Sequence, residues 1–170
     1  MRLIWDVVET VALALILFLL IRNVVQNFRI EGHSMEPNFH DGQYLVVNRL
    51  AYRFGKPARG DVIVFRYPND PSRDFIKRVV GLPGEKVEIR MGQVFINDQP
   101  LIEPYGPAES TYSAPPIIVA QDQLYVLGDN RANSSDSHNW GPLPMSYVVG
   151  KAVLCYWPPQ YWGPVRHGGT

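Results

Sequence analysis

The sequence contains very little cysteine and no excess of either charge. Cys155 is the one cysteine among the 170 residues, so neither a disulfide within the chain nor a CxxC metal site can form. Its apolar neighbours in the run VLCYW indicate a small buried side chain rather than a reactive thiol. Sixteen basic residues balance sixteen acidic ones. Because a nucleic-acid-binding protein carries a basic excess, this balance predicts no nucleic-acid partner.

Long apolar runs are also scarce, and the one that is present lies near the start of the chain. Residues 11–21 carry no charge, and residues 3–25 reach the roughly 20 positions that a membrane-spanning helix needs. Arg22 can extend its charge to the membrane surface, and Trp5 suits a membrane interface. We therefore predict a membrane anchor over residues 1–25.

Two other interpretations of this run are a cleaved signal peptide and a buried core helix. A signal peptide would have a basic start and small residues before its cleavage site. Here Arg2 is offset by Asp6 and Glu9, and Arg22 and Asn23 follow the apolar run. The length and the flanking residues favour the anchor. Charge does not set its orientation, because basic residues lie on both sides.

The rest of the chain has the pattern of a β protein. Fifteen prolines and fourteen glycines indicate short strands joined by many turns. Runs rich in β-branched and aromatic residues predict strands at residues 27–30, 44–48, 62–67, 75–80, 86–90, 93–96, 124–127 and 148–156. Residues 68–74 are predicted to form a loop, residues 99–116 an irregular excursion, and the tail from Trp157 a frayed end. Without repeats or further helical periodicity, the predicted fold class is mainly β.

Ser34, in the stretch EGHSMEPNF, is the candidate nucleophile. A serine hydroxyl is a poor nucleophile until a base removes its proton. Among the four histidines, His138 is the one suitable base, with Asp129 or Asp136 to orient it. Lysine is the alternative base for a serine nucleophile.

Lys77, in the run FIKRVV, is the lysine best placed for that role. A lysine base must be neutral near pH 7, so its pKa must fall by roughly 3 pH units, which burial in apolar surroundings can achieve. Strand alternation places Lys77 on one face with Phe75 and Val79. A solvated edge strand is the alternative, and periodicity alone does not decide between the two.

Four sequence boxes then occur in a fixed order: SMEP, RGDVIVFRYP, FIKRVVGLPGE and GDNRANSSDSHNWGPLP. Together, behind an apolar segment, they resemble the conserved boxes of type I signal peptidases, the membrane-anchored Ser–Lys proteases that remove signal peptides. The resemblance extends over most of residues 28–144. It implies a mainly β, antiparallel-sheet catalytic domain of the signal peptidase I type, preceded by one N-terminal transmembrane helix. The short stretch between the last two boxes predicts little or no separate accessory domain.

The resemblance also implies roles for individual residues. Ser34 is similar to the nucleophile, whose backbone N–H contributes to the oxyanion hole, and Lys77 is similar to the general base. Ser134 is similar to the serine that orients the lysine, and Asp136 to the carboxylate that pairs with Arg78. The apolar positions similar to those around the substrate subsites are Phe28, Ile30, Met35, Phe39, Val64, Phe75 and Ile76.

Three positions depart from the family pattern. Gly32 stands where some members have a serine that completes the oxyanion hole, so the second donor is not identified. His138 stands where an arginine is frequent and would support Asp136 in its place, and Ala132 stands where an aspartate is frequent. The form DSHNWGPLP resembles the thylakoid-type branch of the family.

The GDNR turn also has simpler interpretations. Asp129 can give structural support through side-chain bonds to its own turn. A calcium loop formed by Asp129, Asn133 and Asp136 would lack the required glycine and glutamate, so no metal site is predicted.

These features predict a single-span membrane protein in which residues 26–170 form an extracytoplasmic, β-rich serine protease domain. We expect it in the plasma membrane, with the thylakoid membrane as the alternative. Its partners would be the lipid bilayer and exported preproteins, whose signal peptides it would remove after Ala-x-Ala through an acyl-enzyme on Ser34. No cofactor is expected. The alternatives are a Ser–Lys autoprotease of the repressor type, which the apolar N-terminus and zero net charge disfavour, and a non-enzymatic anchored β module that binds exported chains.

Overall fold

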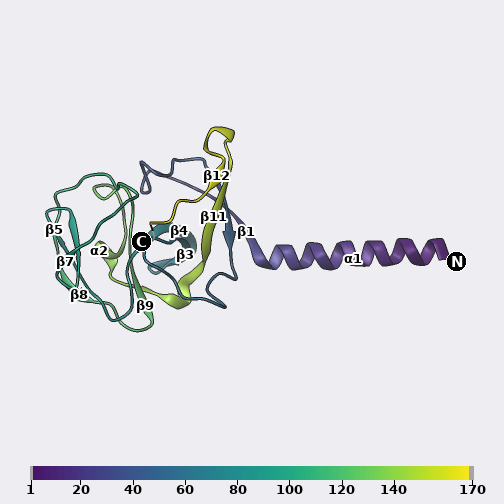
Figure 1. The fold of residues 1–170 in the computed structure, drawn as a ribbon, viewed down its shortest axis with the longest axis horizontal. Helices are drawn as coiled ribbons and strands as arrows, with labels where there is room; N and C mark the ends of the chain where they lie inside the picture. The colour runs from purple at the N-terminus through teal and green to yellow at the C-terminus, as the bar shows by residue number, and fades with distance from the viewer. Residues whose placement is uncertain (1, 169–170) are drawn as a thin grey trace.

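The computed structural model describes residues 2–168 of the chain. One long helix projects from a body of antiparallel strands (Figure 1). The helices are α1 (Arg2–Val24) and α2 (Ser137–Trp140), with 3-10 turns η1 (Met145–Tyr147) and η2 (Pro159–Tyr161). The strands are β1 (Val25–Arg29), β2 (Tyr44–Asn48), β3 (Val62–Tyr67), β4 (Asp70–Gly81), β5 (Lys86–Arg90), β6 (Gln93–Ile96), β7 (Gln99–Pro100), β8 (Ala114–Ile118), β9 (Gln123–Leu127), β10 (Leu143–Pro144), β11 (Val148–Trp157) and β12 (Gly163–Pro164).

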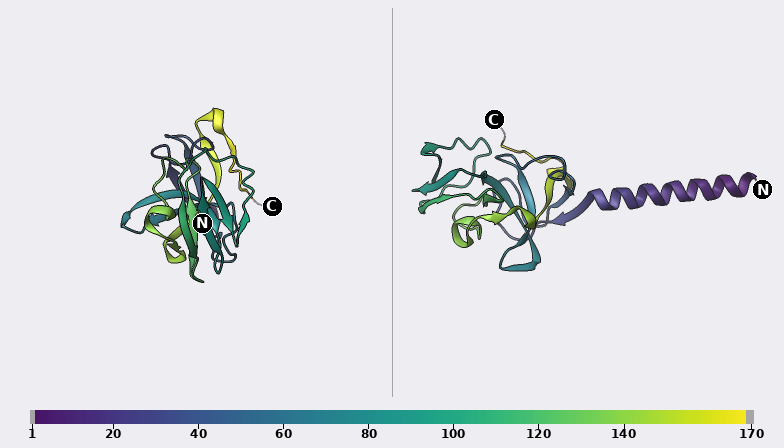
Figure 2. Two further views of the ribbon diagram at one scale, coloured as in Figure 1. Left: turned by 90° about the vertical axis from the view of Figure 1, so that its left-hand side faces the viewer. Right: turned by 90° about the horizontal axis from the view of Figure 1, so that it is seen from below.

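Helix α1 leaves the body of the protein without packing against it. Its residues Ile4–Val24 form a helix long and apolar enough to cross a membrane, and none of this segment is buried in the protein. The view from below shows the same separation (Figure 2, right). Such an exposed, mainly apolar helix of 21 residues is compatible with the predicted membrane anchor by length and composition.

The larger sheet places the candidate site at its centre. Its strands follow the order β1-β2-β11-β3-β4-β9-β10, and β12 pairs with β11. Strand β4 lies between β3 and β9, with Lys77 opposite Ile63 and Arg78 opposite both Val62 and Leu127. Strand β4 has a neighbour on each side and is not an edge strand, and residues 76–81 of its second half are buried. The solvated edge considered for Lys77 is therefore excluded.

The smaller sheet is formed by residues between the last two sequence boxes, where little or no separate accessory domain was predicted. Its order is β7-β6-β5-β8. Val87 and Ile89 of β5 pack with Val80, Tyr125 and Leu127 of the larger sheet in one cluster. The two sheets therefore share a hydrophobic core.

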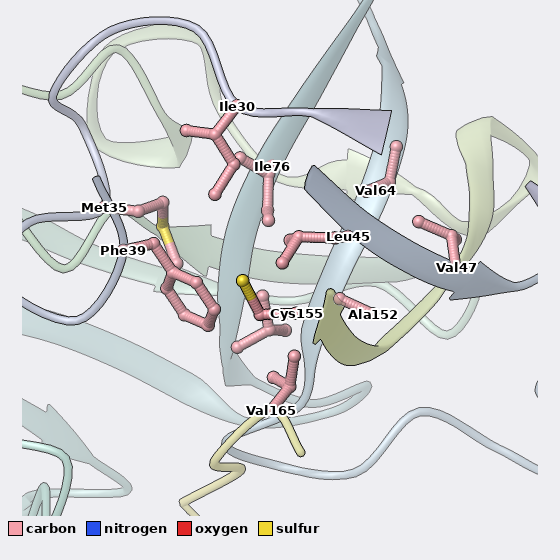
Figure 3. Packing of buried hydrophobic residues seen from close by; sticks show 11 residues of the cluster. Ile30, Met35, Phe39, Leu45, Val47, Val64, Ile76, Ala152, Cys155 and Val165 are labelled. Atoms are coloured by element: carbon pink, nitrogen blue, oxygen red, sulfur yellow. The ribbon is translucent and has the colours of Figure 1, made fainter. Parts of the chain in front are cut away.

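A second cluster lies behind the turn that carries Ser34. It joins β1, β2, β3, β4 and β11 to that turn through apolar side chains (Figure 3). Met35 and Leu45 are fully buried in it. Cys155 is also buried there, which confirms the structural interpretation of the lone cysteine.

The predicted strands are confirmed, and two predictions about the connections were wrong. Strand β4 begins at Asp70, inside the predicted loop, because its first residues extend the β3–β4 hairpin. Strand β8 lies inside the predicted irregular excursion, where it pairs with β5 despite two prolines, which an edge strand tolerates. The short helix α2 was not predicted, because four residues are too few for a helical period.

The tail, predicted to be frayed, is ordered through Gly168. After β12, Val165 is buried in the core, and its N–H donates to the Val153 carbonyl at 3.0 Å. His167 accepts the Val62 N–H at 3.2 Å through Nδ1. Burial lowers the pKa of His167 to about 4, which keeps this ring nitrogen available as an acceptor. These bonds to strands far away in the sequence fix the tail, and a local pattern does not reveal them.

Candidate active site

Ser34 and Lys77 meet in the structure although 43 positions separate them. Ser34 lies in the turn after β1, and Lys77 lies in the buried half of β4. Lys77 Nζ is 2.7 Å from Ser34 Oγ and also donates to the Ile76 carbonyl at 2.9 Å. The Lys77 side chain is only 3% exposed. The structure therefore places a serine hydroxyl against a buried amine.

Burial gives this amine an unusual proton affinity. Removal from water lowers the pKa of Lys77 from 10.5 to about 8, because the charged ammonium loses its hydration. The carboxylates of Asp136 and Asp129 act in the opposite direction through their negative charge. About a tenth of the Lys77 side chains are then neutral at pH 7, a fraction far above that of an exposed lysine.

A cleft of about 350 Å³ opens over this pair. The strand residues Phe28, Phe75 and Ile76 supply apolar walls. The remaining lining residues besides Ser34 and Lys77 are Glu31, Gly32, His33, Arg73, Asp74, Asn133 and Ser135. The cleft is therefore apolar beside the two strands and polar at its margins.

The GDNR turn holds the backbone on which Ser34 lies. Asn130 donates its backbone N–H to the Ser34 carbonyl and its side-chain amide to the His33 carbonyl, both at 3.0 Å. A Cβ at Gly128 would lie 2.2 Å from Ser134 Oγ and 2.4 Å from the Ser34 carbonyl oxygen, so this close approach requires glycine. The turn thus positions Ser34 through backbone contacts.

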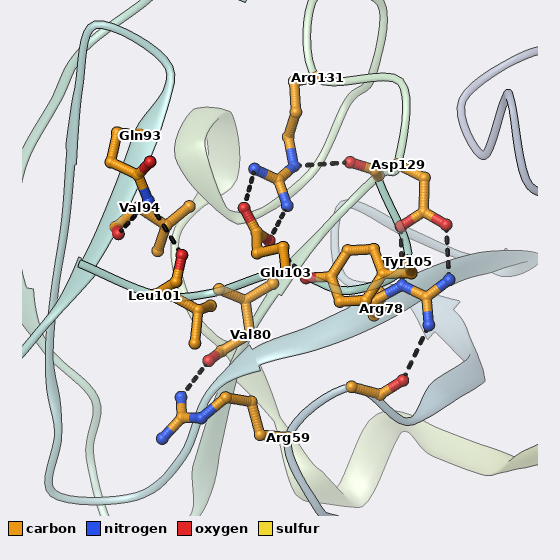
Figure 4. Close-up of polar contacts among 12 residues, drawn as sticks. Arg59, Arg78, Val80, Gln93, Val94, Leu101, Glu103, Tyr105, Asp129 and Arg131 are labelled. Atoms are coloured by element: carbon orange, nitrogen blue, oxygen red, sulfur yellow. Dashed lines mark hydrogen bonds and ion pairs between the residues drawn. The ribbon is translucent and has the colours of Figure 1, made fainter. Parts of the chain in front are cut away.

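Arg78 pairs with Asp129, so the predicted Arg78–Asp136 pair was wrong. Arg78 Nε donates to Asp129 Oδ1 at 2.8 Å and Nη2 donates to Oδ2 at 2.6 Å, with both side chains buried (Figure 4). Asn38, just after the Ser34 turn, donates to the same carboxylate at 2.9 Å. Asp129 is the nearer partner because the turn after β9 brings it opposite Arg78 across the β4–β9 pairing. This carboxylate links the strand of Lys77 to the segment of Ser34.

Asp136 has a different role, as the N-cap of α2. Its Oδ1 accepts the His138 N–H at 3.2 Å, and its Oδ2 accepts the Gly128 N–H at 2.9 Å. His138 Nδ1 lies 2.6 Å from Asp136 Oδ1, and the His138 ring stacks on Tyr112. Within residues 2–168 no hydrogen bond joins His138 to Ser34, so the structure brings Lys77, and not His138, to the nucleophile.

Ser134 lies beside the Ser34 turn, close to Gly128. Its hydroxyl is buried and has no hydrogen-bond partner among the residues that the structure describes. Its predicted role in orienting Lys77 stays a prediction.

The predicted substrate-contacting residues divide into two groups. Phe28, Phe75 and Ile76 line the cleft. The other four are buried in the cluster behind the Ser34 turn, where they support its shape: Ile30, Met35, Phe39 and Val64.

Several residues of the site were not found in the sequence. Asn133 and Ser135 line the cleft, and Asn38 and Asn130 hold the Ser34 turn. Their only sequence signal was membership of the two boxes around Ser34 and GDNR. Amides in turns have too many local uses for their type alone to indicate a tertiary contact.

The backbone at Ser34 suits stabilisation of negative charge. The Ser34 N–H donates to no acceptor within the described part of the chain, so it remains available to an oxyanion. Gly32 has φ +87°, a conformation that a serine would adopt only with strain, and its N–H is bound to Asp41 at 2.8 Å. A free backbone N–H, a hydroxyl and a buried amine in one cleft are the groups that acyl transfer requires.

Comparison with known proteins gives the family. The family model described as signal peptidase, peptidase S26, matches residues 4–157. Signal peptidase I of Leptolyngbya laminosa is 43% identical over 160 residues, which cover 89% of this chain and 78% of that protein. Thylakoidal processing peptidase 1 of Arabidopsis thaliana is 38% identical over 141 residues, which cover 77% of this chain and 42% of that protein. The crystal structure of a signal peptidase I from Enterococcus faecalis gives a TM-score of 0.49 at 31% identity, over 57% of this chain and 97% of that chain.

The site and the family agree on a peptidase. The chain belongs to the signal peptidase family, peptidase S26. The resemblance inferred from the four boxes is thereby confirmed.

Proposed function

We propose that this protein is a membrane-anchored endopeptidase that removes N-terminal signal peptides from exported preproteins, with Ser34 as nucleophile and Lys77 as general base. The observation that carries the proposal is the 2.7 Å contact between Lys77 Nζ and Ser34 Oγ, with Lys77 buried. The family membership supports the substrate class.

In the first half of the reaction, neutral Lys77 accepts the Ser34 proton as Oγ attacks the scissile carbonyl carbon. The carbonyl oxygen becomes negative and is stabilised by the Ser34 N–H. The C–N bond then breaks, the Lys77 ammonium gives its proton to the leaving amine, and the signal peptide remains as an ester on Ser34. A water molecule attacks this ester with Lys77 again as base, and the proton returns to Ser34 Oγ as the acyl group leaves.

The specificity for small residues before the cut, the Ala-x-Ala pattern, is part of the proposal. The apolar walls at Phe28, Phe75 and Ile76 are supplied by strands that pack on a filled core. A cleft of about 350 Å³ with such fixed walls accepts small side chains more readily than bulky ones.

Helix α1 would anchor the enzyme, with the catalytic domain on the extracytoplasmic side. The substrate's own apolar segment would lie in the same bilayer, so anchoring raises the local concentration of substrate. The plasma membrane is the proposed location and the thylakoid membrane the alternative; one relative that matches the chain is named a thylakoidal processing peptidase.

The test is cleavage of a detergent-solubilised preprotein with an Ala-x-Ala site. Ser34→Ala and Lys77→Ala should each abolish cleavage, whereas Lys86→Ala, at a partly exposed lysine paired with Asp98, should leave it unchanged. Replacing the alanine before the cut by phenylalanine should block the unaltered enzyme. Loss of activity in His138→Ala together with retention in Lys77→Ala would reverse the assignment of the base.

A further inference from the structure

The connection between β2 and β3 lies where α1 enters the domain. Strand β2 is antiparallel to β1, and its last residue, Asn48, is opposite Val25, the first residue of β1. The next N–H, of Arg49, donates to the carbonyl of Val24, the last residue of α1, at 2.9 Å. Residues 49–56, which we call the basic loop, therefore begin at the end of the apolar helix.

The basic loop carries cations without carboxylate partners. Arg49, Arg53 and Lys56 are exposed, and none forms an ion pair within the described residues. No acidic residue occurs between Gly42 and Gly60. Because the whole chain has a formal net charge of zero, this is a local excess of positive charge.

These cations lie outside the sequence window that sets membrane topology. The orientation of a spanning helix depends on the basic residues within roughly 15–20 positions of its ends, and Arg49 lies further along the chain than that. The loop reaches the helix end only through the β1–β2 pairing. A role in the folded protein is therefore the better explanation of its charge.

The loop also presents an aromatic side chain and has a fixed shape. Phe54 is 87% exposed, more than any other large apolar side chain that the structure describes. The Arg53 N–H donates to the Leu50 carbonyl at 3.0 Å, and the Tyr52 hydroxyl donates to buried Asp61 at 2.8 Å. Since the loop is already folded, little conformational entropy is lost when it binds a surface.

We propose that the basic loop is a docking surface for anionic lipid headgroups, with Phe54 inserted among them. The inference rests on the proposed anchoring by α1, which would bring the bilayer surface to the point where the loop begins. Lys and Arg beside an anionic membrane, together with one aromatic ring at headgroup depth, form a recognised interfacial pattern. The contact would set the height and tilt of the domain over the bilayer by adding a second attachment point beside the junction of α1 and β1 at residues 24 and 25.

The test uses the full chain reconstituted in vesicles, with Cys155→Ala so that one introduced cysteine can be labelled. An environment-sensitive dye is placed by Phe54→Cys, and its quenching by a lipid-borne quencher is measured. The matched control is Ile102→Cys, 84% exposed and outside both sheets. In vesicles of phosphatidylcholine with phosphatidylglycerol, we expect a blue shift and quenching at position 54 only. In pure phosphatidylcholine, both signals at position 54 should fall.

A triple variant, Arg49→Gln, Arg53→Gln and Lys56→Gln, should lower the affinity of the loop for the anionic membrane surface about a hundredfold, at about fivefold per cation. Equal quenching in both lipids, or none at position 54, would overturn the proposal. A dye at Leu13→Cys reports on the anchor, and a signal there outside the bilayer would remove the basis of the inference. Preprotein cleavage in detergent is a separate readout. It should be unchanged in the triple variant, and its absence in the unaltered chain would refute the proposed function without affecting the lipid contact.

Discussion

Replacing Lys77 by methionine is expected to abolish cleavage and to change how stability depends on pH. In the folded protein, burial lowers the pKa of Lys77 to about 8, whereas in the unfolded chain it returns to 10.5. Between these values the unfolded state binds more protons than the folded state. The free energy of unfolding of the unaltered protein should therefore rise with pH in this window, and the methionine variant should lack that rise.

The magnitude follows from the same two pKa values. A fall from 10.5 to about 8 corresponds to about 3 kcal/mol against the protonated form. Roughly 1 kcal/mol of this is recovered between pH 7 and pH 9, and the rest above pH 9. Methionine also loses the bonds to Ser34 Oγ and the Ile76 carbonyl, at about 1 kcal/mol each. At pH 7 the variant should consequently be more stable by about 1 kcal/mol.

The assay is urea unfolding of the full chain in detergent, followed by tryptophan fluorescence at pH 7 and pH 9. Lys86→Met is the matched control, because Lys86 is partly exposed and its pair with Asp98 lies at the surface. The difference in unfolding free energy between Lys77→Met and the unaltered protein should shrink as pH rises. If the two proteins show the same pH dependence, Lys77 is not buried in the way described, and the reasoning about its proton affinity fails.

Three further predictions concern the same site. The kcat/KM of preprotein cleavage should rise about fivefold from pH 7 to pH 8 and level off above pH 9, because neutral Lys77 is the active form and its pKa is about 8; a rate independent of pH would contradict this base. Asp129→Asn leaves the buried charge of Arg78 without its partner and should lower the free energy of unfolding by about 3–5 kcal/mol in urea titrations, while a loss below about 1 kcal/mol would mean that the pair is dispensable. Gly32→Ala should lower it by about 1 kcal/mol, because φ is +87° there while open space surrounds the added methyl group; an unchanged midpoint would show that the backbone relaxes.

Much of the fold could be predicted from local patterns. The predicted strands at residues 44–48, 62–67, 86–90 and 93–96 match β2, β3, β5 and β6 because short β-branched runs between turn residues have few other stable conformations. The start of β4 and all of β8 could not be predicted in this way. Their residues are polar or proline-rich and become strands only because a neighbouring strand supplies hydrogen bonds.

The candidate site likewise has features that the sequence predicted and features that it did not. Ser34 and Lys77 were proposed from the chemistry of serine nucleophiles and from the box pattern, and the structure brings them to 2.7 Å. The partner of Arg78 was predicted incorrectly, because Asp129 and Asp136 lie seven positions apart in one loop and residue type does not distinguish them. The path of the loop after β9 selects Asp129 for Arg78 and leaves Asp136 to cap α2.

The sequence by itself determined that the chain has one apolar helix, a mainly β domain and a serine followed by a lysine in an apolar strand, because these features depend on residue type and short-range period. Only the tertiary structure decided whether that lysine is buried, which carboxylate pairs with its neighbour Arg78, and where the basic loop lies. Each of these depends on which distant strands become neighbours, and that pairing results from burying apolar faces across the whole domain.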